Sequence, residues 1–256
     1  MDKLAVIKIG GKIVEEEASL RKFLDDFAAF PGYKVLVHGG GRSATAIASK
    51  LGIENKMIDG RRITDAETLK VVTMVYGGLV NKNIVAGLQA RGINALGVTG
   101  ADLNLIRSVK RPVKDVDYGF VGDIEQVDTS ILEMLIRRNI VPVLVPLTHD
   151  GHGNLLNTNA DTVAAEVAKS LSRNFEITLV YCFEKEGVLS NENIGNSVIP
   201  RINKERFHQL IEEGIIGSGM IPKLENSFSA VHAGVSKVII TSSSDIKGEF
   251  GTLIEK

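Results

Sequence analysis

Two lysines stand where a purely structural role explains them poorly. Lys8 lies within the aliphatic run VIKIGG, which is typical of a buried strand, and a buried ammonium is unfavourable unless an anion meets it or it reaches an edge. Lys223 follows Pro222 in GSGMIPKLEN, and proline suits the first turn of a helix. A cation beside the positive end of the helix dipole is also unfavourable by itself. Both positions make sense if a phosphate binds between them.

Glycines follow two of the predicted strands. Gly10 and Gly11 come after the first strand, and HGGG at residues 38–41 ends the second and leads into a helix. Glycine lets the backbone approach a ligand, and a helix N-terminus offers free N–H donors to an anion. The second turn, with Ala44 and Asp59, also fits a dinucleotide-binding spacing, and a plain tight turn is the structural alternative. Two neighbouring glycine ends favour a shared phosphate cradle.

Asp161 opens a predicted helix in NLLNTNADTVAAEVA. An acid at this position is often only a cap that favours the helix dipole, and the functional alternative is a carboxylate that orients lysines by ion pairing. Together with Lys8 and Lys223 it describes a phosphoryl-transfer site, because cations and backbone N–H groups stabilise the transferred phosphoryl oxygens. The nucleotide site must differ from a Walker A loop, since Gly10-Gly11-Lys12 lacks the upstream glycine and the Ser/Thr.

The elements that must position these residues alternate between strands and helices, which predicts an α/β fold with a mainly parallel sheet. Strands are expected at residues 4–9, 34–38, 95–99, 141–147, 177–181 and 238–241. Helices are expected at residues 19–30, 43–51, 64–76, 79–91, 131–137, 162–171, 204–213 and 223–233, the third opened by a capping box from Thr64 to Glu67. Residues 107–127 have no helical period and predict a β-hairpin.

Composition restricts the class of protein. The chain has 256 residues, and its 30 basic and 31 acidic residues give a net charge of −1, which argues against nucleic-acid and polybasic membrane surfaces. A lone cysteine, Cys182, excludes an intramolecular disulfide and a cysteine-rich metal site. With neither a signal peptide nor an apolar run of about 20 residues, we expect a soluble cytoplasmic protein of one compact domain with two lobes.

Five motifs occur in an order and spacing that resemble the amino-acid kinase superfamily, and within it the acetylglutamate kinase family, over essentially the whole chain. They are KIGG at residues 8–11, HGGG at 38–41, GRRIT at 60–64, NTNAD at 157–161 and GMIPK at 219–223. The resemblance implies an open αβα sandwich with one continuous central sheet. It also implies an N-terminal lobe, residues 1–172, that binds the acyl amino acid and carries a homodimer contact, and a C-terminal lobe, residues 173–256, that binds ATP.

The same resemblance implies the roles of single residues. Lys8 and Lys223 are expected to stabilise the transition state, and Asp161 to hold them. The acyl substrate is expected to contact Gly40, Gly41, Arg62, Asn157 and Asn159, with Arg62, and by motif register not Arg61, clamping a carboxylate. The nucleotide is expected to contact Gly10, Gly11, Gly187, Ile216 and Gly217. The segment from Phe183 to Gly187 departs from the family pattern, which leaves these nucleotide contacts least well defined.

The expected activity is ATP-dependent phosphorylation of the side-chain carboxylate of N-acetyl-L-glutamate, a step towards arginine, with Mg²⁺ carried on the ATP phosphates and no metal site in the protein. Kinases of carbamate, aspartate, a nucleoside monophosphate or N-succinylglutamate are alternatives within the enzyme class. The succinyl compound would need a further cation, for which Arg42 and Arg61 are candidates, although both fit solvated surface positions better. A catalytically silent sensor is the alternative from another class, against which both lysines and Asp161 argue.

Three histidines invite a catalytic or metal-binding interpretation. His149, Asp150 and His152 lie together in THDGHGN, but Asp-Gly and His-Gly pairs favour a turn between strands. His38 ends a predicted strand, where a structural role is favoured. We therefore predict no metal ligand among them.

Overall fold

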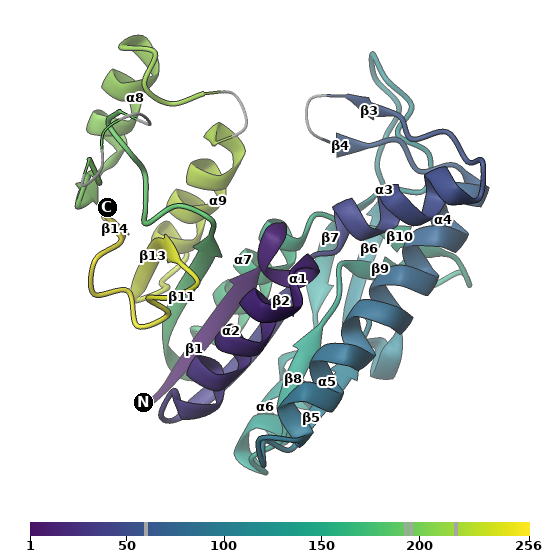
Figure 1. Ribbon diagram of the computed structural model, residues 1–256, viewed down its shortest axis with the longest axis horizontal. Helices are drawn as coiled ribbons and strands as arrows, with labels where there is room; N and C mark the ends of the chain where they lie inside the picture. Colours follow the sequence, from purple (N-terminus) through teal and green to yellow (C-terminus); the bar gives the residue numbers. More distant parts are fainter. Residues whose placement is uncertain (59–60, 192–193, 195–196, 218–219) are drawn as a thin grey trace.

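An eight-stranded sheet runs through the computed structural model, which describes all residues except 59–60, 192–193, 195–196 and 218–219 (Figure 1). Its strand order is β12-β14-β13-β11-β1-β2-β8-β5, and every neighbouring pair is parallel except β13 and β14. The strands are β1 (Asp2–Ile9), β2 (Tyr33–His38), β5 (Ala95–Val98), β8 (Val141–Leu144), β11 (Phe175–Phe183), β12 (Arg201–Ile202), β13 (Lys237–Ser242) and β14 (Thr252–Ile254). The sheet therefore continues across the lobe boundary through the pairing of β1 with β11.

Helices cover both faces of this sheet, so the predicted αβα sandwich is confirmed (Figure 1). Residues of β1 alternate between two cores: Leu4 and Val6 pack on one side, Ala5 and Ile7 on the other. The first core contains side chains of α6 (Thr129–Arg137), α7 (Ala160–Leu171), α8 (Lys204–Glu212) and α9 (Ile221–His232). The second contains side chains of α1 (Lys12–Glu15), which the sequence did not predict, α2 (Glu17–Ala29), α3 (Gly41–Lys50), α4 (Ala66–Val72) and α5 (Asn81–Gln89).

A second, four-stranded sheet lies beside the main one in the order β10-β9-β6-β7. It contains the predicted hairpin, as β6 (Ile106–Lys110) and β7 (Gly122–Val127), together with β9 (Leu147–His149) and β10 (Leu155–Asn157). The predicted strand at 141–147 was too long, because Pro146 lacks an N–H and the chain leaves β8 there to enter β9 in the second sheet. The chain also forms a small hairpin of β3 (Met57–Ile58) and β4 (Arg61–Arg62), and the 3₁₀ turn η2 (Asp102–Asn104).

The helices predicted at 64–76 and 79–91 are one rod. A π-helical segment, η1 (Thr73–Val80), joins α4 to α5, so Gly77 and Gly78 do not end the helix. The inner face of the rod is buried along its length, which overrides the low helix propensity of the two glycines. The span from Ala66 to Gln89 is the one described helix that is long and apolar enough to cross a membrane, a property that core helices of water-soluble proteins share.

The rod begins with a different cap from the one predicted. Asp65, and not Thr64, accepts a hydrogen bond at 2.8 Å from the backbone N–H of Thr68. The hydroxyl of Thr64 instead donates to the carbonyl of Arg62, and its own oxygen accepts from Asn157. The capping-box prediction was therefore wrong by one residue. Thr64 is buried, and its hydroxyl is engaged by Arg62 and Asn157 and does not cap the helix.

Candidate active site

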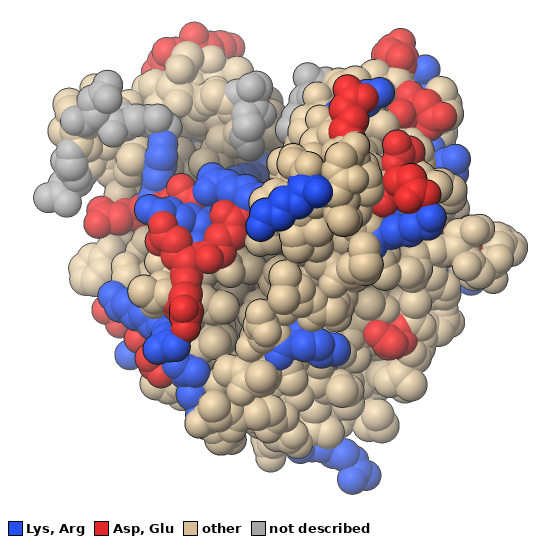
Figure 2. All heavy atoms as spheres, turned by 45° about the vertical axis from the view of Figure 1, so that its right-hand side comes forward, with Lys and Arg blue, Asp and Glu red and all other residues tan. Residues whose placement is uncertain are grey.

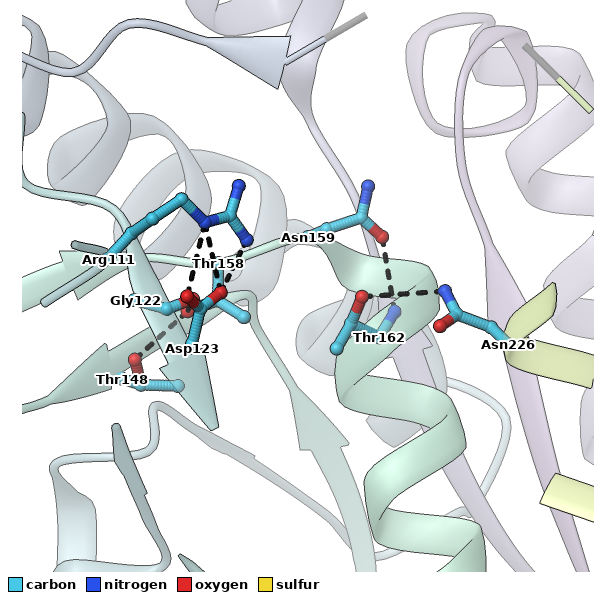
Figure 3. A network of polar contacts seen from close by, with 8 residues as sticks. All are labelled: Arg111, Gly122, Asp123, Thr148, Thr158, Asn159, Thr162 and Asn226. Atoms are coloured by element: carbon cyan, nitrogen blue, oxygen red, sulfur yellow. Dashed lines mark hydrogen bonds and ion pairs between the residues drawn. The ribbon is translucent and has the colours of Figure 1, made fainter. Parts of the chain in front are cut away.

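Lys8 and Asp161 form a buried ion pair, with Lys8 Nζ 2.7 Å from Asp161 Oδ1. Strand alternation turns Lys8 to the same face as Leu4 and Val6, the face that α7 covers. Asp161 is free for this pairing because Asn159 caps α7: its Oδ1 accepts from the N–H groups of Asp161 and Thr162 at 2.8 and 3.1 Å (Figure 3). The interpretation of Asp161 as a mere helix cap is thus excluded.

Lys223 joins this pair through an aromatic ring. Its Nζ lies 3.9 Å from the centroid of the Phe183 ring, and Lys8 Nζ lies 5.1 Å from the same centroid. Phe183 in turn stacks on Tyr181, with ring centroids 6.1 Å apart and planes 12° from parallel. Burial lowers the pKa of Lys223, and the Lys8 charge lowers it too, whereas Asp161 opposes this shift. Two ammonium groups are therefore held close together, which suits the binding of a phosphate.

A cavity of about 390 Å³ extends from Lys223 and Asp161 to the hairpins, and Lys8, the ion-pair partner of Asp161, is not among its lining residues. Its lining comes from α9 at one end, here called the lysine end, and from the β3–β4 and β6–β7 hairpins at the other, here called the hairpin end (Figure 1). The lining residues are Gly39, Gly40, Gly41, Met57, Arg61, Arg62, Tyr76, Arg111, Val121, Pro146, Asn157, Thr158, Asn159, Ala160, Asp161, Thr162, Pro222, Lys223, Glu225 and Asn226. All five predicted substrate residues are among them, together with Asp161 and Lys223.

Arg62, in the cavity lining, is held by several hydrogen bonds. Its Nη1 donates to Asn55 Oδ1 at 2.6 Å, and its Nη2 donates to the carbonyl of Gly41 and to Thr45 Oγ1 at 2.8 and 2.7 Å. A guanidinium has five N–H donors, so these three bonds leave donors for a ligand. Arg62 is buried and Arg61 exposed, an asymmetry that agrees with the motif register.

Two glycines leave space for the side chains that lie against them. A Cβ at Gly10 would lie 2.8 Å from Lys8 Nζ, and one at Gly40 would lie 2.9 Å from the Tyr76 ring. Gly10 therefore leaves room for the lysine, and Gly40 leaves room for the π-helical segment. Asn157, the next predicted residue, donates to Thr64 Oγ1 at 3.0 Å and so ties β10 to the start of the rod.

The residues predicted to bind the nucleotide are not brought into this cavity. Gly10, Gly11, Gly187, Ile216 and Gly217 are outside its lining, and the Ile216 side chain is buried in the core. Of the five motifs, Gly60 and Gly219 lie outside the described residues, as does Asp59 of the dinucleotide spacing.

Several lining residues escaped the sequence analysis, foremost Arg111 and Tyr76. Arg111 forms a forked ion pair with Asp123 of β7, and neighbouring bonds join Thr148, Thr158 and the carbonyl of Gly122 (Figure 3). In the sequence, Arg111 is only a basic residue within the predicted hairpin. The sequence does not show that this hairpin lines a cavity. Arg42, by contrast, lies outside the lining and pairs with Glu184 at 3.4 Å.

His38 and the turn around Asp150 have structural roles. His38 is fully buried; its Nδ1 donates to the carbonyl of Gly39 at 2.7 Å, and its Nε2 accepts from Asn81 Nδ2 at 3.1 Å. Burial lowers the pKa of His38 to about 4, so it is neutral at pH 7. Asp150 accepts from the N–H groups of His152 and Asn154 in the turn between β9 and β10, as the turn interpretation predicted. The described residues contain no cluster of three acidic, histidine or cysteine side chains that could hold a metal ion.

The fold and the lysine pair define a phosphoryl-transfer enzyme, and the sequence model of the Amino acid kinase family matches residues 3–242. A protein named acetylglutamate kinase from Bacteroides thetaiotaomicron is 70% identical over 255 residues, covering 100% of this chain and 99% of its own length. Another of that name from Phocaeicola vulgatus is 68% identical, again covering 100% and 99%. The crystal structure of smu.665 from Streptococcus mutans has a TM-score of 0.82 at 27% identity, covering 98% of both chains. The chain therefore belongs to the acetylglutamate kinases of the amino acid kinase family.

Proposed function

We propose that this enzyme transfers the γ-phosphoryl group of ATP to the side-chain carboxylate of N-acetyl-L-glutamate, giving an acyl phosphate on the route to arginine. The observation that carries the proposal is the grouping of Lys8, Asp161 and Lys223: Asp161 and Lys223 line the lysine end of a cavity that the substrate motifs also line, and Lys8 is ion-paired with Asp161. The high identity to proteins named acetylglutamate kinase over the full chain supports the same substrate.

The chemistry needs no protein base. The substrate carboxylate is ionised at pH 7, and one of its oxygens attacks the γ-phosphorus while the bond to the ADP oxygen breaks, so no proton moves. Lys8 and Lys223 stabilise the charge on the transferred oxygens, and Asp161 keeps Lys8 in place. An arriving phosphate favours the charged form of Lys223, which offsets the lowering of its pKa by burial.

ATP is proposed to bind on the side of residues 173–256, with the acyl amino acid on the side of residues 1–172. In support, the substrate set lies on β4, β10, the N-cap of α7 and the glycine turn, whereas Lys223 and Phe183 belong to residues 173–256. Mg²⁺ would travel on the ATP phosphates and neutralise part of their charge; the acid Asp161 is already engaged by Lys8, which fits a metal held by the nucleotide.

A homodimer of about 55 kDa, twice the 27.6 kDa chain, is proposed as the working form. The rod from α4 to α5 exposes Met74 and Leu79 on its outer face, at 56% and 51% of their surface. An isologous contact through this face would cover them. Light scattering that gives 27.6 kDa at micromolar concentration would contradict it.

We further propose a cytoplasmic location and small-molecule partners only. The single cysteine is buried, and its thiol pKa is raised by burial to about 12, so the thiolate form is disfavoured and its reactivity low. On the face in Figure 2, basic and acidic side chains are interspersed, which differs from the continuous basic surface of a nucleic-acid-binding protein.

The test is a coupled assay for ADP with N-acetyl-L-glutamate, carbamate, aspartate and no acceptor, with hydroxylamine trapping of the acyl phosphate. We expect ADP release and hydroxamate formation together with N-acetyl-L-glutamate. Fastest turnover with carbamate or aspartate would contradict the substrate. Calorimetric binding of ATP and acylglutamate without any turnover would favour the sensor alternative.

A further inference from the structure

Two guanidinium groups at the hairpin end of the cavity have no task in the reaction proposed above. Arg61 of β4 and Arg111, which follows β6, both line that end, together with Met57 and Val121. If the side-chain carboxylate lies at the lysine end and the α-carboxylate at Arg62, as the proposed function requires, the N-acyl group extends towards the hairpins. An acetyl methyl gives two guanidinium groups nothing to bind.

Arg111 uses only part of its donor set. Its Nε donates to both carboxylate oxygens of Asp123, at 3.0 and 3.2 Å, and its Nη2 also donates to Asp123. Nη1 points away from Asp123 (Figure 3), is shielded from water, and has no hydrogen-bond partner among the described residues. Buried donors without an acceptor are rare in folded proteins, and one that belongs to a cavity-lining side chain points to an acceptor on the ligand.

Arg111 is well placed to present this donor. Its backbone N–H donates to the carbonyl of Val121 at 2.8 Å, which extends the β6–β7 ladder by one step and fixes the side chain's origin. Residues 112–117, which follow it, are mostly exposed and have no regular secondary structure, so the neighbourhood can yield slightly to a ligand.

Arg61 adds charge that the protein leaves uncompensated. Its side chain is exposed, and no carboxylate of a described residue pairs with it. Near it, Arg62 is bonded to an amide, a carbonyl and a hydroxyl, none of which carries charge. A substrate with a carboxylate at the end of its acyl chain would meet both charge and directed donors here, which is what a buried carboxylate needs.

We propose that Arg111 and Arg61 form a second anion-binding site for the acyl group. N-acylglutamates whose acyl chain ends in a carboxylate, of which N-succinyl-L-glutamate is the simplest probe, are then substrates of the enzyme and are preferred over N-acetyl-L-glutamate. Arg111 supplies the directed N–H donor and Arg61 the uncompensated charge. The inference rests on the proposed kinase function and specifies its acyl specificity.

The first experiment compares kcat/KM of the wild-type enzyme for N-acetyl-, N-butyryl- and N-succinyl-L-glutamate at saturating ATP. The butyryl group has the length of the succinyl chain without its charge. We expect the succinyl compound to exceed the acetyl compound by tenfold or more, and the butyryl compound to be no better than the acetyl one. Equal gains from butyryl and succinyl would assign the preference to cavity size and overturn the proposal.

The second experiment removes the guanidinium groups one at a time. Arg111→Gln and Arg61→Gln should each lower kcat/KM for the succinyl compound at least tenfold while changing the acetyl value less than threefold. Arg107→Gln is the matched control, because Arg107 lies on β6, is exposed, pairs with Glu125 at 3.9 Å, and is not among the residues that line the cavity. If Arg111→Gln fails to fold, the kinetics of Arg61→Gln still test the proposal, because Arg61 is exposed.

The outcomes separate this inference from the proposed function. If the acetyl compound is turned over as well as or better than the succinyl compound, or if both arginine variants retain the succinyl preference, the second anion site is refuted and the kinase activity stands. If the folded wild-type enzyme phosphorylates none of the three compounds, the proposed function fails, and this inference fails with it.

Discussion

The ammonium of Lys8 is held on three sides. Asp161 pairs with it at 2.7 Å, the Phe183 ring lies 5.1 Å away, and Gly10 leaves the space into which Nζ projects. Such positioning before the substrate arrives is what electrostatic stabilisation of a transition state requires. Under the proposed function the side chain binds an anion, and the hydrophobic core does not depend on its charge.

Lys8→Met and Lys223→Met should each lower kcat by roughly two to three orders of magnitude, the usual loss for one oxyanion-stabilising contact. Thermal unfolding should show that both variants fold. Lys3→Met is the control, since Lys3 is an exposed lysine of the same strand, β1. Near-wild-type turnover in a folded Lys8→Met protein would remove Lys8 from the site.

Phe183→Leu should lower kcat by about three- to thirtyfold with little change in KM for the acyl substrate. Cation–π contacts are worth about 0.5–2 kcal/mol, and Phe183 makes two of them, to Lys8 and Lys223. Phe183→Tyr keeps the ring face and should retain most of the activity. Steady-state kinetics of both variants check this, and equal losses in the two would show that the ring acts only through packing.

At the scale of elements, the site depends on the contact between the glycine turn and the π-helical segment of the rod. The Tyr76 ring of η1 packs against the Cα of Gly40, and both line the cavity. π-Helical segments occur often at functional sites, and this one positions Tyr76 beside Arg62.

Gly40→Ala should lower the free energy of unfolding by about 1–3 kcal/mol, the usual cost of overpacking, and raise KM for the acyl substrate. The reason is the 2.9 Å approach of a Cβ to the Tyr76 ring. Gly41→Ala provides the stability comparison, because its Cβ would meet its nearest neighbours at 3.9 Å, an ordinary contact. Chemical denaturation of the two variants measures the difference, and equal stabilities would contradict the packing argument.

The main sheet could be predicted from the sequence because strand-like and helix-like hydrophobic patterns alternate along the chain. The lysine pair could be predicted because each lysine occupies a position where a cation alone is unfavourable. The rod was missed because Gly77 and Gly78 normally interrupt helices, and only burial of the inner face decides otherwise. Arg111 was missed for a related reason. Its significance depends on which sheet β6 joins, and pairing between distant strands has no local signature.

At the scale of the whole molecule, His38 joins the sheet to the rod. Asn81 of α5 donates to His38 Nε2 at 3.1 Å and to the carbonyl of Val143 at 3.0 Å, so three elements meet at this neutral ring. Protonation of Nε2 would remove the acceptor and place a charge in the core.

The free energy of unfolding should therefore fall as the pH is lowered. The folded pKa of His38, about 4, lies below the ordinary value of 6.5, so between these values the unfolded chain binds a proton that the folded chain does not. The contribution is complete above pH 6.5 and is lost through the window down to pH 4, on the order of 3 kcal/mol in all. Denaturation at pH 7, 5.5 and 4.5 measures it. His38→Gln should lack this dependence, and the exposed His208→Gln should retain it.

The position of β1 also bears on how the protein is made. Strand β1 lies between β2 and β11, yet β11 begins only at Phe175, more than 160 residues later in synthesis. Until β11 has been synthesised, the nascent protein can pair β1 on one side only, and the run from Leu4 to Ile9 presents an unpaired apolar edge. A translation pause before Phe175 should thus lengthen the interval in which this edge recruits chaperones or another nascent chain.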